Sequence, residues 1–169
     1  MNQFLIPAAM IIAATLSTLL PHPQNFTPMA AIALFSGASF LDQRAAFGFP
    51  FAVLLLRDLW LGLHVLMPAV YGAFFLTVLI GFKLREKRNA WRIIAAAASG
   101  SVVFFILTNF AVWAQLGTFP RTTMGLAACY TAALPHFKNT LLGDLVYSAC
   151  IFGIAALAQH RFKRVEATA

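Results

Sequence analysis

Charged residues are scarce in this chain. Only 10% of its 169 residues are Asp, Glu, Lys or Arg, and 61% are hydrophobic, whereas a soluble domain carries about 25% charged residues. This scarcity excludes an ordinary soluble domain and indicates a protein of the lipid bilayer. We attribute the net charge of +7 to membrane topology, so we expect no nucleic-acid partner.

Cysteine and the common catalytic motifs are also rare or missing. The two cysteines, Cys129 and Cys150, lack a CxxC spacing, and the four histidines lack a zinc-binding spacing. The patterns GxSxG, HExxH, GxGxxG and the P-loop are all missing. We therefore predict packing cysteines, assign no catalytic residues and expect no resident cofactor.

Long apolar segments, in contrast, occupy the whole chain. They predict an all-α membrane protein, a compact bundle of six transmembrane helices in a single domain, residues 1–169. A signal peptide is disfavoured because Met1-Asn2-Gln3 carries no positive charge, and three prolines within residues 21–28 exclude a helix there. The predicted helices are 4–20, 28–41, 45–66, 68–84, 92–116 and 139–159, and the loop 117–138 holds a short helix at 123–134.

Basic residues lie mostly on one side of this predicted topology. With both termini in the cytoplasm, only Arg121 and Lys138 fall outside, which is the asymmetry that the positive-inside rule describes. Arg57 lies within a predicted helix. The basic residues on the cytoplasmic side are Arg44, Lys83, Arg85, Lys87, Arg88, Arg92, Arg161, Lys163 and Arg164.

An aspartate interrupts the last apolar helix. Asp144 lies about six residues inside it, roughly 9 Å deep, where a charge costs on the order of 3 kcal/mol. Helical spacing places Thr140 on the same face as Asp144, with Asn139, Gly143 and Tyr147 beside them. Such a carboxylate usually has a partner or a ligand.

Other polar residues fall at a similar depth. Arg57, Asp58 and Asn109 lie roughly 9–14 Å below the outer surface, as Asp144 does. We hypothesise that the four residues form one network beneath a cavity open to the outside. Alternatively, Arg57 pairs with Asp58 or Asp144 and the network only locks the bundle. The polar and aromatic residues above this level are His22, Asn25, His64, Trp113, Tyr130, His136 and Asn139.

Several short motifs resemble a family of small bacterial membrane proteins without assigned function. That family is similar to the substrate-binding S components of energy-coupling-factor (ECF) vitamin transporters, including the solitary cobalamin transporter group called BtuM. The resemblance covers nearly the whole chain. Its motifs are Asn25-Phe26-Thr27-Pro28, Arg57-Asp58 with Leu61-Gly62 and His64, Thr108-Asn109-Phe110 with Trp113, Cys129-Tyr130, and Asn139-Thr140-Leu141 with Gly143-Asp144.

The resemblance implies a transport protein of the bacterial cytoplasmic (inner) membrane. Such a protein captures a vitamin-sized molecule from the outer side. An ECF coupling module docks on its first helix, here at Ala9 and Ala13, although ordinary internal packing is the simpler explanation of these alanines. Cobalamin or a related compound is the expected substrate. The ligand-binding residues would be His22, Asn25, Phe26, Arg57, Asp58, His64, Asn109, Trp113, Tyr130, Asn139 and Asp144.

One departure from the solitary cobalamin group concerns the metal. That group uses a cysteine of the third helix as cobalt ligand, but no cysteine lies between Phe47 and Met67 here, so His64 would have to serve. An alternative function is a small integral-membrane enzyme that uses Asp58, Asp144 and a histidine. A third is a structural or assembly subunit.

Overall fold

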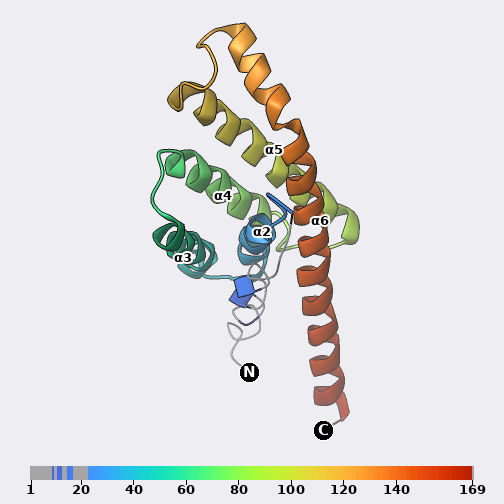
Figure 1. Ribbon diagram of the computed structural model, residues 1–169. Coiled ribbons are helices and arrows are strands. Elements are labelled where there is room, and N and C mark those ends of the chain that lie inside the picture. Colours follow the sequence, from blue (N-terminus) through green and yellow to red (C-terminus); the bar gives the residue numbers. More distant parts are fainter. Residues whose placement is uncertain (1–8, 10, 13–14, 17–22, 169) are drawn as a thin grey trace.

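Every regular element that the structure describes is a helix. The computed structural model describes residues 9, 11–12, 15–16 and 23–168, and within these ranges there is no strand. Most of the predicted helix 4–20 lies outside the described residues. The helices, drawn in Figure 1, are α2 (Met29–Ser39), α3 (Gln43–Leu61), α4 (Met67–Phe82), α5 (Ala90–Gln115) and α6 (Thr123–Thr168).

Two of these helices are long and apolar enough to cross a membrane. They are α5 and the part Thr123–Ala158 of α6. The helix α2 has 11 residues, which rise about 16 Å, against a bilayer core of about 30 Å. The described residues thus form an all-helical protein with two candidate spans, and they do not provide the six predicted ones.

The short helix predicted at 123–134 begins at Thr123 as expected, but the predicted break between it and the last helix is wrong. The helix α6 already begins at Thr123 and runs through Pro135 without interruption. Proline removes one helical hydrogen bond and costs about 3 kcal/mol, but contacts with α5 hold the chain on both sides of it. The hydroxyl of Tyr130 donates to the Ile106 carbonyl at 2.6 Å, and the rings of Phe137 and Phe105 are 4.7 Å apart. Tertiary packing therefore outweighs the local cost.

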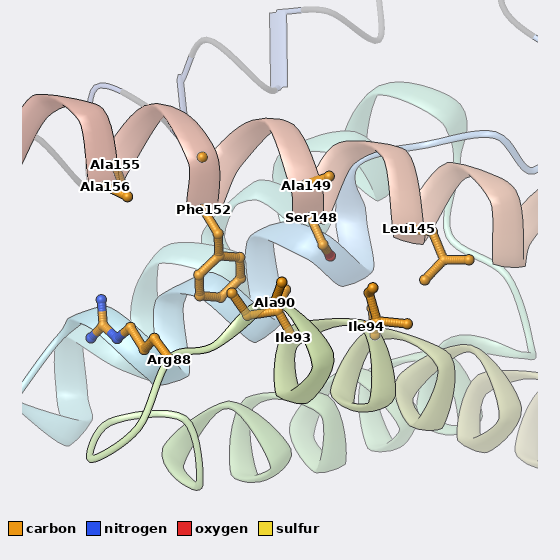
Figure 2. Close-up of a pocket in the computed structure, with 12 residues that line it drawn as sticks. Arg88, Ala90, Ile93, Ile94, Leu145, Ser148, Ala149, Phe152, Ala155 and Ala156 are labelled. Carbon is orange, nitrogen blue, oxygen red and sulfur yellow. The ribbon is translucent and has the colours of Figure 1, made fainter.

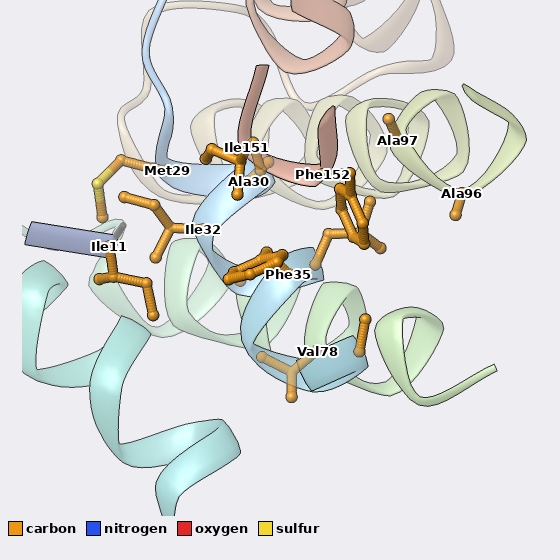
Figure 3. Packing of buried hydrophobic residues seen from close by; sticks show 14 of the residues in the cluster. Ile11, Met29, Ala30, Ile32, Phe35, Val78, Ala96, Ala97, Ile151 and Phe152 are labelled. Atoms are coloured by element: carbon orange, nitrogen blue, oxygen red, sulfur yellow. The ribbon is translucent and has the colours of Figure 1, made fainter. Parts of the chain in front are cut away.

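The short helix α2 is the centre of the hydrophobic core. All of its residues from Met29 to Ala38 are buried, and α3, α4, α5 and α6 all contact it. Figure 3 shows Phe35 of α2 with Phe152 of α6 on one side and Val78 of α4 on the other. The rings of Phe35 and Phe152 meet edge-to-face with centroids 5.2 Å apart. A helix too short to span the bilayer is thus enclosed by longer ones.

Two glycines bring α2 and α4 into backbone contact. A Cβ atom on Gly37 would overlap the Val78 carbonyl oxygen, and one on Gly81 would overlap the Leu34 carbonyl oxygen. Small residues let two helices approach this closely, and van der Waals packing then stabilises the pair. The Gly37–Gly81 crossing therefore sets the position of α4 against the core.

Two arginines of the loop between α4 and α5 donate hydrogen bonds to the carbonyls at the C-terminal end of α2. Arg85 donates from Nε to the Gly37 carbonyl at 2.9 Å and from Nη2 to the Phe40 carbonyl at 2.6 Å. Arg88 donates to the Ala38 carbonyl. The last carbonyls of a helix have no partner within it, and arginine satisfies them while complementing the negative end of the helix dipole.

Substitution of the crossing glycines tests this packing. Gly37→Ala and Gly81→Ala should each lower the free energy of unfolding in detergent by about 1–3 kcal/mol, because the added methyl meets backbone that cannot move away. The matched control is Gly72→Ala, also in α4, where a Cβ meets nothing within 4 Å. This control should be neutral or stabilise by up to about 1 kcal/mol. If all three substitutions changed the free energy of unfolding equally, this would contradict a close approach of α2 and α4 at Gly37 and Gly81.

Candidate functional site

A polar cavity lies beyond the N-terminal end of α2. Its volume is about 200 Å³, and it is lined by residues of the loop before α2, of every described helix and of the loop between α3 and α4. The apolar wall comes from Met29, Ala30, Val70, Phe74 and Phe104. The polar lining comes from Asn25, Thr27, Arg57, His64, Thr140 and Asp144.

A second, smaller hollow adjoins this cavity. It measures about 130 Å³ and shares the lining residues Asn25, Phe104 and Thr140 with the first, so the two hollows are neighbours. Asn109 and His136 line the second hollow only. The structure thus brings six residues of the predicted polar set, Asn25, Arg57, His64, Asn109, His136 and Asp144, to two neighbouring hollows.

Asp144 is buried and takes its partner from α5. The Ser101 hydroxyl donates to Asp144 Oδ2 at 2.6 Å. The same hydroxyl lies 3.1 Å from the Ala97 carbonyl, but its single proton can serve only one acceptor at a time, and the shorter contact favours Asp144. Sequence reasoning missed Ser101, because a serine within an alanine-rich helix shows no sign of a long-range partner.

The predicted network of Arg57, Asp58, Asn109 and Asp144 does not form. Arg57 makes no ion pair with either aspartate within 4.0 Å, although all three residues belong to the described part of the chain. Consecutive helical residues point about 100° apart, so Arg57 lines the cavity while Asp58 is buried on another side of α3. The Asn109 amide donates to the Phe105 carbonyl of its own helix at 2.8 Å.

Asp58 instead faces a histidine and a tyrosine. His64 Nε2 lies 3.9 Å from Asp58 Oδ1, and 42% of the His64 side chain is exposed. The Tyr71 hydroxyl is close enough to interact electrostatically with Asp58, but neither it nor Asp58 Oδ2 has a partner with the geometry of a hydrogen bond within the described residues. Asp58 therefore lies beside His64, which lines the cavity, but does not line the cavity itself.

The loop before α2 is fastened to one face of α6. The Asn139 amide donates to the Gln24 carbonyl at 3.1 Å, and a Cβ on Gly143 would lie 3.2 Å from Phe26 Cα. The rings of Phe26 and Tyr147 are 5.6 Å apart. Phe26 and Asn139 are thus positioning residues rather than part of the cavity wall.

Asn25 has a left-handed backbone at φ 63°. Asparagine adopts this conformation more readily than most residues with a side chain. It lines both hollows, which is consistent with its predicted place in the binding site. The loop before α2 thus places the side-chain amide of Asn25 at the wall that the two hollows share.

Other predicted site residues lie away from the cavity. The Trp113 indole donates to the Pro120 carbonyl at 2.9 Å, and Tyr130 is bonded to α5. Ala9 is an exposed helical residue, whereas His22 and Ala13 lie outside the described residues. Within those residues, no group of three or more His, Cys, Asp or Glu side chains could hold a metal ion. His64 would be a lone ligand.

Comparison with known proteins gives one match. A model described as "Family of unknown function (DUF6580)" matches residues 1–166. No curated protein and no solved structure matches the chain. The resemblance to ECF S components and to the solitary cobalamin group therefore stays a prediction.

A double-mutant cycle tests the partner of Asp144. Ser101→Ala should lower the free energy of unfolding by about 1–3 kcal/mol, because it leaves a buried carboxyl group without its donor. In an Asp144→Leu background the same change should cost little, since no polar partner remains. As a control, Arg57→Gln should have equal effects in both backgrounds. Additive Ser101 and Asp144 effects, or coupling of Arg57 with Asp144, would contradict this pairing.

Proposed function

The chain belongs to the family of unknown function DUF6580, and we propose that it captures a small molecule from the outer side of a bacterial cytoplasmic membrane for uptake. The observation that carries this proposal is the cavity in which Arg57 and Asp144 share one space without pairing with each other. Two such groups provide separate binding points for a ligand, and pockets for small molecules are mostly apolar with a few placed polar groups.

The surface of the protein supports the membrane part of the proposal. Besides the two candidate spans, α3 and the loop after it expose a dense set of large apolar side chains, and Trp60 is 89% exposed. Such a contiguous patch indicates contact with lipid or another protein. We propose that the bilayer covers it and that α3 and α4 also lie within the membrane. The exposed residues of this patch are Leu55, Leu56, Leu59, Trp60, Leu61, Leu63 and Val65.

The placement of the cavity supports binding from outside. The basic loop residues Arg85 and Arg88 lie at the C-terminal end of α2, and the cavity lies at its N-terminal end. If the basic loop faces the cytoplasm, as the positive-inside rule favours, the cavity is on the outer side. Both termini are then cytoplasmic in the predicted topology.

The size of the cavity supports a small substrate. Its 200 Å³ lie below the range of about 300–1,000 Å³ typical of pockets for drug-sized ligands. Cobalamin is larger than such ligands and would require the cavity to open. We therefore favour a smaller substrate that offers an anionic group to Arg57 and a hydrogen-bond donor to Asp144.

Uptake requires a further step after capture. Either an ECF coupling module docks on the first helix at Ala9 and Ala13, or the bundle tilts unaided. Both routes rest on the resemblance to S components, and both leave the binding site of the substrate in the same cavity. The binding proposal is therefore tested independently of the transport route.

Mass spectrometry of small molecules that copurify with the detergent-solubilised protein tests the proposal. A recurring compound should be found, and its affinity should fall by about tenfold or more in Arg57→Gln, since each 1.4 kcal/mol lost is a factor of ten. The control is Arg44→Gln, which changes an exposed arginine of α3 that does not line the cavity. Unchanged affinity in Arg57→Gln would contradict the proposal. Turnover of the compound would favour the alternative, a membrane enzyme that uses Asp58, Asp144 and a histidine.

A further inference from the structure

A groove larger than the proposed substrate cavity lies between α5 and α6 and shares no lining residue with that cavity. Its volume is about 490 Å³, and its walls are small or apolar side chains (Figure 2). Ala97 on α5 and Ala149 and Gly153 on α6 leave this space because they lack long side chains. A Cβ on Gly153 would meet nothing within 4 Å.

A buried polar group opens into this groove. Ser148 is 1% exposed, and its hydroxyl has no hydrogen-bond partner within the described part of the chain. It lines the groove, with its oxygen directed away from α6 (Figure 2). A buried hydroxyl without a partner is destabilising, so a ligand that supplies a hydrogen-bonding atom here would be stabilised.

A positive charge marks one end of the groove. Arg88 lines it beside Ala90, and in Figure 2 it lies at the end beyond Phe152. Burial, and secondarily the charge of neighbouring Arg85, lower the pKa of Arg88 from its usual value. An anion would relieve this repulsion. The same loop carries Lys83 and Lys87, and Arg92 follows in the first turn of α5; these three do not line the groove.

We propose that this groove binds one anionic phospholipid. An acyl chain fills the apolar part between α5 and α6, and the phosphate lies at Arg88. The Ser148 hydroxyl, which is about two helical turns before Ala155 in α6, donates to an ester oxygen. Basic pockets between membrane helices on the cytoplasmic side recognise anionic headgroups in this manner. The inference rests on the membrane embedding and orientation proposed above, but not on the substrate of the other cavity.

Lipid retention and thermal stability test the proposal. The purified protein should retain phosphatidylglycerol in native mass spectrometry, and added phosphatidylglycerol should raise its melting temperature more than phosphatidylcholine does. Arg88→Gln should reduce retention by about fivefold, as expected when one basic residue is removed from an anionic-lipid site. Arg88 also donates a hydrogen bond to the Ala38 carbonyl at the end of α2, so a loss in this variant alone would not distinguish weaker lipid binding from impaired folding.

Gly153→Leu is the variant that separates lipid binding from folding. Gly153 lines the groove, and a Cβ there meets nothing within 4 Å, so the variant should fold but lose its response to phosphatidylglycerol. Gly48→Leu is the matched control, because Gly48 also has open space around it and lies outside the groove. A wild-type lipid response in Gly153→Leu, equal responses to both lipids, or a copurifying protein in the groove would overturn the proposal.

Binding of the copurified small molecule distinguishes the two proposals. Gly153→Leu should leave that binding unchanged, because the substrate cavity shares no lining residue with the groove. Loss of the lipid response with intact small-molecule binding is the expected result. If lipid specificity is absent in every variant while the small molecule still binds, only the lipid site is wrong.

Discussion

The hydrogen bonds from Arg85 and Arg88 to the end of α2 are the interaction on which the rest of the structure depends. An eleven-residue helix that ends inside a protein leaves carbonyls without partners, and unsatisfied backbone groups are costly at membrane depth. The two guanidinium groups supply the donors from a loop nearly fifty residues away in sequence. With this end satisfied, α2 can be buried completely, and Gly37 and Gly81 can hold α4 directly against it.

The opposite end of α2 then becomes a site for polar chemistry. The chain before it carries three prolines within residues 21–28 and is fastened to α6 through Asn139 and Gly143. That arrangement leaves a small cavity between the loop and the surrounding helices. Arg57 and Asp144 line it from different helices and do not pair with each other; Asp144 accepts a hydrogen bond from Ser101 instead. The arginine hydrogen bonds and the cavity therefore lie at the two opposite ends of the same buried helix, α2.

Much of this arrangement could be predicted from the sequence because proline and polar breaks mark helix ends. The predicted helices 28–41, 68–84 and 92–116 correspond closely to α2, α4 and α5. Of the four residues that were placed at a common depth, Arg57 and Asp144 line the cavity, together with Asn25 and His64, which were placed above them. The continuation of the helix 123–134 through Pro135 into the last helix was missed, because contacts of Tyr130 and Phe137 with α5 outweigh the local cost of the proline. The partner of Asp144 was missed because depth does not give side-chain direction. Counting depth likewise could not show that adjacent Arg57 and Asp58 point apart.

The central claim is that the cavity faces outward while the arginine-rich loop faces the cytoplasm. Single cysteines placed in a background without Cys129 and Cys150 test it, using a membrane-impermeant thiol reagent on intact cells. The sites are Thr118 and Glu86, which are exposed residues in the α5–α6 and α4–α5 loops. Thr118→Cys should be labelled in intact cells, and Glu86→Cys should be labelled only after the membrane is permeabilised. The reverse pattern would place the cavity on the cytoplasmic side and contradict capture from outside.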